Sequence, residues 1–572
     1  MKEYIFSNTR KWQQLLACAA AVIFALLSAK ALADADLVVI NADVRTVDQQ
    51  VSHAQAFAIK AGKFVKVGSN EAIKSLIGSN TKIINAQGKT VIPGLIDGHT
   101  HLHSGIDLIR GVDLYELSSK SQWLAAIAAR DKTLLAGDWL LGGRWDYTRD
   151  EKGVLPTKDD LDAVVSDRPI FLRDIDYHSA WVNSKALALA GITKDTKAPE
   201  GGEIILDPNT GEPTGVLTET AMALVTGSKA FQQNTKNLAA ALRDTVQYVN
   251  SKGLTSVHDM AEVGAINDYL ALQEQGQLSL RVWFGAFSLW GDNANIEGEF
   301  NNFVAVRKSL AQHKTSATGP LLDFGYIKVV YDGVLSIYTA ALKAPYSDKP
   351  DTKGVPFFDT KILNDVIRRA NSNGFPVSVH AIGDKSVSDT LDAFANSKGK
   401  HKLRNRIEHI EVVDPADISR FKDANVTASM QPNHGVLGDY ILERIGKKRE
   451  PHAYAWKTML DQGVTLVLGS DWPTATLDPL TQLGDAVLRQ RHGKKWQGQN
   501  ALSFDEALYA YTQAGADMAG WGDQIGSIAK GKWADFVMLD GTLPEPLDNS
   551  IRDRAVAMTY IGGKQVYRKK GQ

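Results

Sequence analysis

The sequence predicts an α/β fold: a (β/α)8 TIM barrel with an inserted cap, and a small β domain to which both chain ends contribute. Two observations indicate this architecture. Through the middle of the chain, short apolar strands that end in a polar residue alternate with helical stretches, which is the pattern of βα units around a parallel sheet. At both ends, apolar and polar residues alternate around glycine and asparagine turns, which is typical of antiparallel strands.

Residues 1–33 are predicted to be a signal peptide. Lys2, Arg10 and Lys11 precede an apolar run, and the "ALA" that ends at Ala33 has the small-x-small pattern that signal peptidase accepts. We expect cleavage after Ala33 and a periplasmic or secreted protein without membrane contact. An uncleaved N-terminal anchor is the alternative, although the run is shorter than the about 20 residues of a membrane span.

The composition narrows the classes of partner. The chain has 64 basic and 65 acidic side chains, so no strong field would recruit nucleic acid or an anionic membrane. We therefore expect a small-molecule substrate. The single cysteine, Cys18, lies in the predicted signal peptide, so a metal ion in the mature chain must be held by nitrogen and oxygen. The oligomeric state is left open, a homo-oligomer included.

Residues 34–93 and 521–572 form the predicted composite β domain. The two ends share an alternation of apolar and polar residues that the middle of the chain lacks, so we expect one domain built from both. Its strand candidates are "DLVVINADVRTVD", "AFAIKAGKFVKVGS", "TKIINAQGKTVI", "ADFVMLD" and "AVAMTYIGGKQVYRKK".

Residues 94–520 form the predicted barrel, because they hold eight strand candidates, the number that closes such a barrel. The first two candidates are too far apart in the sequence for a single crossover connection. We therefore expect residues 113–240 to be an inserted cap with its own strand in "RPIFLRDID" and turns in "DPNTGEPTG". The eight candidates are "TVIPGLIDGHTHLH", "LTSVHDM", "LRVWFGAF", "FGYIKVVYDG", "FPVSVHAIGD", "RIEHIEVV", "VTASMQPNH" and "VTLVLGSDWP".

Polar side chains at the ends of five of these strands predict a metal site. The strand ends converge at the C-terminal face of a barrel, which is where its chemistry takes place. Alternation along the first strand sends His99 and His101 to the same side. A lone histidine at a strand end is more often structural, but imidazoles and a carboxylate together are the ligand set of zinc and its neighbours. The candidates are His99, His101, Lys328, His380, His409 and Asp471.

These motifs resemble the amidohydrolase superfamily. The stretches that carry the resemblance are "PGLIDGHTHLH", "IKVVYDG", "SVHAIGD", "RIEHIEV", "LGSDWP" and "IGSIAKGKWADFVMLD". Others are similar to the amidohydrolase 3 subgroup, which includes N-substituted formamide deformylase: "GGRWD", "PTKDDLD", "DYHSAWVNSKAL", "GVLTETA" and "SMQPNH". The resemblance covers residues 36–567. It implies a distorted (β/α)8 barrel, a β-sandwich made from both chain ends, and one or two divalent metal ions.

The resemblance also implies roles for the candidate ligands. His99, His101 and Asp471 would bind the more buried metal ion, and His380 and His409 would bind the second. Zinc is the expected metal, with manganese, iron and cobalt as alternatives. A protonated lysine repels a cation, so Lys328 would act as a CO2-derived carbamate that bridges the metals. The alternative is a Lys328 stem packed in the barrel whose charge pairs with Asp332.

The expected activity is hydrolysis of a non-peptide C–N bond in a small amide, formamide, cyclic amide or carbamate-like compound. A metal-activated hydroxide would attack the carbonyl, and Asp471 would take its proton as general base and pass it to the leaving nitrogen. A deaminase or an esterase would use nearly the same groups. A non-catalytic ligand-sensing or regulatory barrel is the alternative from another class.

Further side chains are weaker candidates, each with a structural alternative. We expect substrate contacts from the cap or from the ends of the second, seventh and eighth strands. His103 is expected to be structural, and Asp332 and Asp384 to hold hydrogen bonds behind the metal ligands. Trp145 and Trp181 would line an apolar pocket near the mouth, unless they are core residues. The substrate-binding candidates are His178, His258, His434, Glu219 and Trp472.

Overall fold

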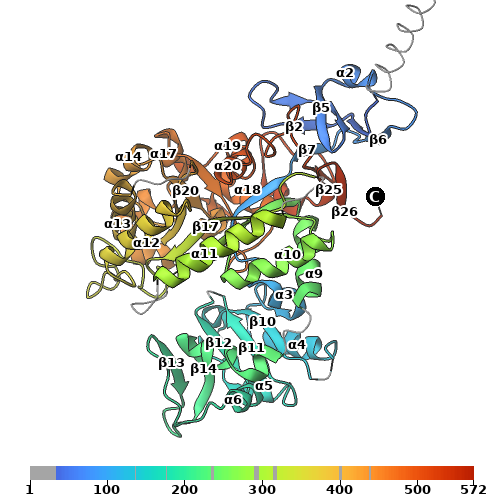
Figure 1. Cartoon of the computed structure of the whole chain (residues 1–572). Helices are drawn as coiled ribbons and strands as arrows, with labels where there is room; N and C mark the ends of the chain where they lie inside the picture. Colours follow the sequence, from blue (N-terminus) through green and yellow to red (C-terminus); the bar gives the residue numbers. More distant parts are fainter. Residues whose placement is uncertain are drawn as a thin grey trace, which may run out of the picture.

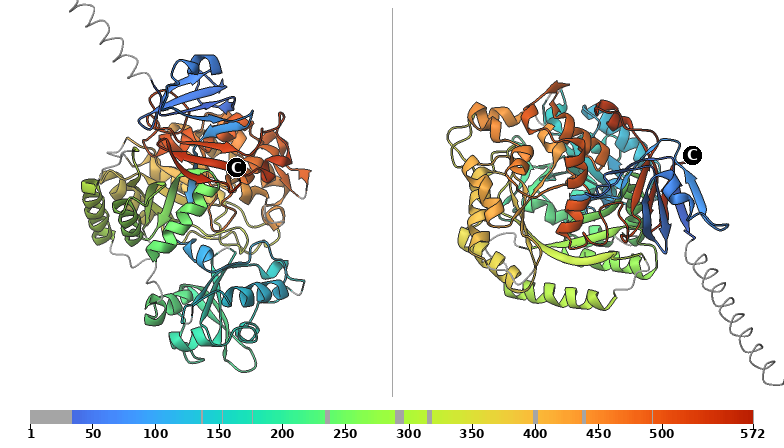
Figure 2. Two further views of the ribbon diagram at one scale, coloured as in Figure 1. Left: turned by 90° about the vertical axis from the view of Figure 1, so that its right-hand side faces the viewer. Right: turned by 90° about the horizontal axis from the view of Figure 1, so that it is seen from above.

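The computed structural model describes residues 34–571 except for 136, 152, 176, 234–237, 289–295, 314–317, 398–401, 437–439 and 492. The predicted signal peptide lies outside the described residues. Within the described part, no helix combines the length and the apolarity needed to cross a membrane. The barrel lies between the composite β domain at one end of the molecule and the cap at the other (Figure 1, Figure 2).

The centre of the molecule is an 8-stranded parallel sheet that curls into a nearly closed barrel. Each predicted strand segment overlaps one of its strands, in the predicted order, so the predicted fold class is confirmed. The strands are β8 (Leu95–Thr100), β15 (Leu254–Ala261), β16 (Arg281–Phe287), β17 (Leu322–Val330), β18 (Val377–Ala381), β19 (Arg406–His409), β20 (Thr427–Met430) and β21 (Leu466–Leu468).

Helices cover the outside of the barrel because one face of each is apolar. In α12 (Thr360–Ser372), Leu363, Val366, Ile367 and Ala370 recur at helical spacing and are buried. The helices are α9 (Leu238–Ser251), α10 (Ile266–Glu274), α11 (Ile296–Leu310), α12, α13 (Asp384–Ala395), α14 (Pro415–Asp423), α17 (Trp456–Asp461), α18 (Pro479–Leu488), α19 (Phe504–Ala510) and α20 (Gln513–Met518), with α3 (Ile106–Arg110), α15 (Pro432–Val436) and α16 (Tyr440–Arg449) in strand-to-helix connections.

The barrel closes where β8 approaches the segment after β21. The Asp471 N–H donates to the His99 carbonyl at 2.7 Å, and the His101 N–H donates to the Trp472 carbonyl at 2.7 Å. Glycine makes this approach possible, because a Cβ at Gly469 would lie 2.4 Å from the His99 nitrogen. The two chain segments that carry His99 and Asp471 are thereby fixed to each other by backbone hydrogen bonds.

Replacing Gly469 by alanine is therefore expected to open this seam. The added methyl group meets backbone, which cannot move aside cheaply, so we expect a loss of about 1–3 kcal/mol of stability. Urea unfolding would measure it. Gly264→Ala is the matched control, because a Cβ there meets nothing within 4 Å. Equal unfolding midpoints for the two variants would show that the seam is not tightly packed.

Both chain ends build one β domain of two sheets. Phe57 in β4 and Phe536 in β24 meet across the sheets with ring centroids 5.0 Å apart, in a shared apolar core. One sheet has the order β5 (Lys63–Gly68), β4 (Ala56–Lys60), β1 (Leu37–Ile40), β6 (Lys82–Asn85); the other has the order β26 (Lys564–Arg568), β25 (Val556–Ile561), β24 (Phe536–Leu539), β7 (Thr90–Pro93), β2 (Asp43–Arg45), β3 (His53–Ala54).

The cap is a separate 6-stranded sheet with its own apolar cores. Trp145 and Trp181 pack in its interior, with indole N–H groups donating to the carbonyls of Leu172 and Thr157, so they are core residues and do not line the mouth. The sheet has the order β13 (Gly202–Leu206), β14 (Pro213–Glu219), β12 (Ser179–Val182), β11 (Ile170–Asp174), β10 (Leu140–Trp145), β9 (Val112–Asp113), with helices α4 (Lys120–Asp131), α5 (Lys158–Asp162), α6 (Ser184–Ala190), α7 (Ala223–Thr226) and α8 (Lys229–Gln233).

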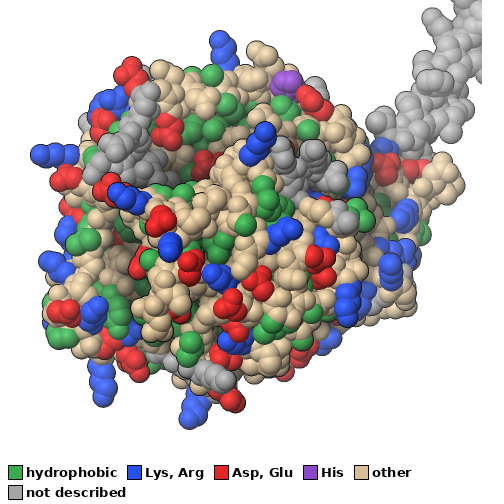
Figure 3. Space-filling model, turned by 90° about the horizontal axis from the view of Figure 1, so that it is seen from below, with side chains coloured by type: hydrophobic (Ala, Val, Ile, Leu, Met, Phe, Trp, Pro, Cys, Tyr) green, Lys and Arg blue, Asp and Glu red, His purple; other side chains and the backbone are tan. Residues whose placement is uncertain are grey.

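The outer surface on the cap side carries charges of both signs. Lysine and arginine side chains are interspersed with aspartate and glutamate side chains over this face (Figure 3). This mixture agrees with the near-zero net charge of the chain.

Candidate metal centre

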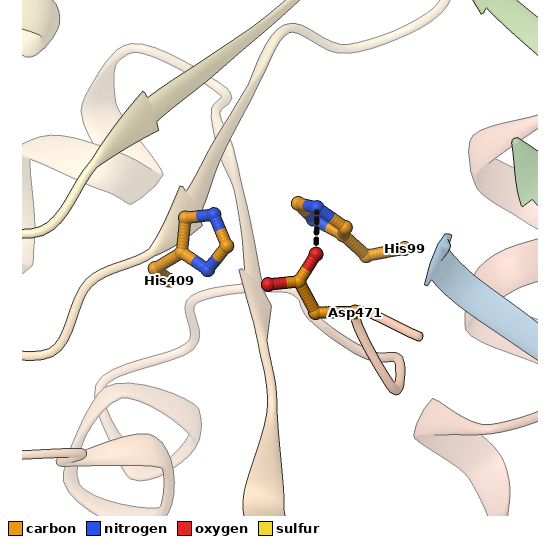
Figure 4. Close-up of side chains that lie close together, drawn as sticks. All are labelled: His99, His409 and Asp471. Carbon is orange, nitrogen blue, oxygen red and sulfur yellow. Dashed lines mark ion pairs between the residues drawn. The ribbon is translucent and has the colours of Figure 1, made fainter. Parts of the chain in front are cut away.

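The six predicted metal-site side chains lie together at the C-terminal end of the barrel. His99 Nε2 and His101 Nε2 are each 3.1 Å from Asp471 Oδ1. The His409 ring centroid is 4.8 Å from that of His99 and 4.4 Å from that of His380. In Figure 4, one oxygen of Asp471 faces His99 and the carboxylate lies beside His409. The remaining side chain is Lys328, whose Nζ is 3.5 Å from His99 Nε2.

The hydrogen bonds of the histidines fix which nitrogen is available to a metal ion. His99 Nδ1 is 2.5 Å from Glu408 Oε2, and His101 Nδ1 is 3.0 Å from the Met260 carbonyl. Both partners are acceptors, so each Nδ1 carries a proton, and a neutral ring then has a lone pair on Nε2. His380 is the reverse case, since its Nε2 donates to the Gly333 carbonyl at 3.2 Å.

These lone pairs converge on Asp471 and fit a cation. Two imidazole lone pairs at 3.1 Å from one carboxylate oxygen repel it unless a positive charge lies among them. Ligand atoms of His99, His409 and Asp471 all lie within 4.8 Å of one another. Zinc binds such atoms at about 2.0–2.2 Å, which places two ligands of one ion about 3–3.6 Å apart, depending on the coordination angle. The side chains present therefore fit a divalent metal ion.

Burial holds the imidazoles in the neutral form that binds metal. It lowers the pKa of His380 to about 3, and it also lowers the pKa of His99 and His409. Burial likewise lowers the pKa of Lys328 to about 8.

Unusual backbone conformations aim two of the side chains into the site. His409 has a φ of 72° and Asp471 a φ of 58°, in the left-handed region that side-chain-bearing residues rarely adopt. Such conformations cost energy and persist at sites where the surrounding structure requires them. Each lies at the point where the chain leaves its strand, so the turn and the ligand position arise together.

Carboxylates behind the ligands hold the backbone of the site. Asp97 accepts hydrogen bonds from the N–H of His99 and from the N–H and hydroxyl of Ser470. Asp332 accepts from the N–H groups of Ala341, Ile382 and Gly383. These bonds give Asp332 a structural role in the loops after β17 and β18.

The substrate-binding candidates fall into different places. His434 lies at the site, with Nε2 3.7 Å from Asp471 Oδ2.

The predicted substrate contact of His258 does not fit the structure. This residue precedes the end of β15 by three residues and is fully buried beside Arg406, so it has no surface for substrate. Trp472 is also buried, at 2% exposure, with its ring packed against Gly105. His103 Nε2 donates to Asp268 Oδ2 at 2.9 Å, away from the ligands.

The other two candidates, His178 and Glu219, form a pair in the cap. His178 Nδ1 is 2.8 Å from Glu219 Oε1, and both side chains are partly exposed. They lie at the edge of the cap sheet at which β10 ends. At the same edge, Arg144 of β10 donates to the carbonyls of Pro473 and Ala475, just beyond Asp471. The pair therefore lies on the edge of the cap that faces the metal site.

Sequence reasoning missed two charged residues of the site, Arg406 and Glu408. Both lie on β19 and are buried inside the barrel, where Arg406 Nε is 2.7 Å from Glu408 Oε1. The signal that would have found them is their alternate spacing in "RIEHIEV", which puts two charges on one face of a buried strand.

Comparisons with known proteins agree with this site. A family model described as an amidohydrolase family matches residues 82–567. The chain is 33% identical to the putative amidohydrolase YtcJ of Bacillus subtilis (strain 168), over 92% of this chain and 98% of that protein. It is 27% identical to N-substituted formamide deformylase of Arthrobacter pascens, over 94% and 99%. A crystal structure of an uncharacterized metal-dependent hydrolase from Pyrococcus horikoshii OT3 is similar with a TM-score of 0.71 and 25% identity, covering 88% of this chain and 97% of that chain.

Proposed function

The chain belongs to the amidohydrolase family of metal-dependent hydrolases, and we propose that it cleaves a non-peptide C–N bond in a small amide, formamide, cyclic amide or carbamate-like compound. One observation carries the proposal: the lone pairs of His99 and His101 converge on Asp471, the predicted proton carrier. N-substituted formamide deformylase, one of the similar proteins, supports a C–N bond as the target.

His99, His101, His380, His409 and Asp471 would hold one or two divalent ions, with zinc expected ahead of manganese, iron or cobalt. When bound, such an ion lowers the pKa of a water molecule and polarises the substrate carbonyl.

Asp471 is proposed to move the proton. Its Oδ1 is turned toward His99 and His101, whereas Oδ2 faces His434. Oδ2 is therefore the oxygen that would accept the proton of the attacking water and then donate it to the leaving nitrogen. An amine leaves poorly unless it is protonated, so this second transfer matters for an amide.

Lys328 is proposed to be carboxylated. Its buried Nζ lies 3.5 Å from His99 Nε2, and burial lowers its pKa to about 8, which raises the fraction of neutral amine available near neutral pH. Nζ would attack the carbon of CO2 and lose a proton, giving a carbamate anion. Its oxygens can bind a metal ion, whereas an ammonium group has no lone pair to offer. The alternative pairing with Asp332 is less favoured, because that carboxylate accepts three backbone hydrogen bonds.

The substrate is proposed to lie between the metal site and the cap. His434 borders Asp471 from the barrel, and the pair of His178 and Glu219 approaches from the cap edge.

We further propose that the protein is exported after cleavage at Ala33. Sequencing the N-terminus of the protein from the periplasmic fraction would test this.

The activity is tested by elemental analysis of the purified protein together with a panel of amides, formamides, lactams, carbamates, amidines and esters. We expect one or two equivalents of divalent metal and turnover of at least one C–N substrate. Turnover of esters alone would reassign the reaction, and turnover of amidines alone would favour a deaminase. A folded protein with neither metal nor hydrolysis would support a ligand-sensing barrel instead.

A further inference from the structure

A buried arginine and glutamate lie behind the metal site, inside the barrel. Arg406 and Glu408 of β19 both point inward, and neither is in contact with solvent. Glu408 Oε2 is 2.5 Å from His99 Nδ1, and its Oε1 accepts from the Ser378 hydroxyl at 2.6 Å and pairs with Arg406 Nε at 2.7 Å. Each carboxylate oxygen therefore has a partner of its own.

Arg406 is fixed just as firmly. It donates to the carbonyl of Gly98, the residue before His99, at 2.9 Å. Its guanidinium lies 4.4 Å from the ring centroid of Tyr326, and it donates to His258 Nδ1 at 3.0 Å. Arginine has only donors, so His258 must accept there. This contact explains why a histidine lies buried in the middle of β15.

We propose that Arg406 and Glu408 are positioning residues of the metal centre, which hold His99 with its proton on Nδ1 and its lone pair on Nε2 directed at the metal. Glu408 selects the tautomer and the ring orientation, because a carboxylate in this position accepts a proton from Nδ1 alone. Arg406 neutralises the buried carboxylate and, through the Gly98 carbonyl, ties it to the backbone next to His99.

The proposal rests on the proposed function only in taking His99 as a metal ligand. Partners that orient a ligating histidine typically change metal affinity by about 10–100-fold. This role would also explain why the core keeps an ion pair, although the removal of both charges from water is costly. A buried pair adds little net stability compared with apolar packing, so its retention here favours a role in ordering the site.

The test is the metal dissociation constant of Glu408→Gln, measured by competition with a chromophoric chelator and zinc. Glutamine keeps the shape but loses the charge, and we expect zinc to bind about 10–100-fold more weakly. Arg406→Lys keeps the charge and loses the forked donor set, so an intermediate weakening is expected. Ser378→Ala removes one donor to Glu408 and offers a milder variant if the others fail to fold.

Asp535→Asn is the matched control. Asp535 forms an equally buried pair with Arg281 at 2.6 Å, but at the N-terminal end of β16, away from the metal site. We expect this variant to lose stability without losing zinc affinity. Unchanged affinity in the Glu408 and Ser378 variants, or an equal loss in Asp535→Asn, would overturn the proposal. Absence of zinc binding by the parent protein would instead count against the proposed function.

Discussion

Replacing Asp471 by asparagine is expected to lower kcat on the best substrate of the panel by about 1000-fold. General acid–base catalysis contributes about 10²–10⁴-fold, and an amide side chain can neither accept nor return the proton. Asparagine keeps one carbonyl oxygen for the metal, so the centre should retain part of its metal. Turnover under saturating metal is the measurement, with metal content determined on the same sample.

The control separates the proton transfer from the loss of a ligand. His101→Asn also removes a side chain of the same centre, its Nε2 lying 3.1 Å from Asp471 Oδ1, but it leaves the carboxylate in place. Excess metal should restore much of the turnover of His101→Asn and little of that of Asp471→Asn. An Asp471→Asn protein with full metal and more than a tenth of the parental kcat would exclude Asp471 as the general base.

Much of this centre was predictable because a parallel barrel brings its strand ends to one face. His99, His101, Lys328, His380 and Asp471 come from strands that are distant in the sequence, yet the closed sheet leaves only one place for such side chains to meet. The same rule failed for His258, because a histidine three residues before the end of its strand lies below the face.

His409 shows where alternation along a strand stops being a guide. Strict alternation would send Glu408 and His409 to opposite faces of β19. The left-handed backbone of His409, with a φ of 72°, breaks that rule at the strand end, so both side chains reach the inside of the barrel. A backbone turn of this kind leaves no mark in the hydrophobic pattern, and neither does the choice of tautomer that it supports.

The cap was predictable as an insertion but its contacts were not. One of its contacts is made by Arg144, which has no sequence signal as a contact residue and yet donates to the carbonyls of Pro473 and Ala475. The chain after Asp471 is therefore held from two sides, by β8 of the barrel and by β10 of the cap. Substrate-contacting residues depend on this docking, which no local pattern encodes.

Replacing Lys328 by alanine is expected to remove at least one metal equivalent and to lower turnover by more than about 100-fold, because the proposed carbamate ligand would be absent. Short-chain carboxylic acids should restore part of both. The alanine leaves a space beside His99 Nε2, which lies 3.5 Å from Nζ in the parent, and acetate or propionate would supply there the two oxygens of the missing carbamate.

A direct readout accompanies the rescue. Parent protein that is stripped of metal and reloaded in the presence of ¹³C-labelled CO2 should give a carbamate carbon signal, and Lys328→Ala should not. Lys385→Ala is the matched control, since that lysine pairs with Asp389 on α13 and has no place in the centre. Full metal content and turnover in Lys328→Ala without added acid would rule out the carbamate and leave Lys328 as a packed, uncarboxylated side chain.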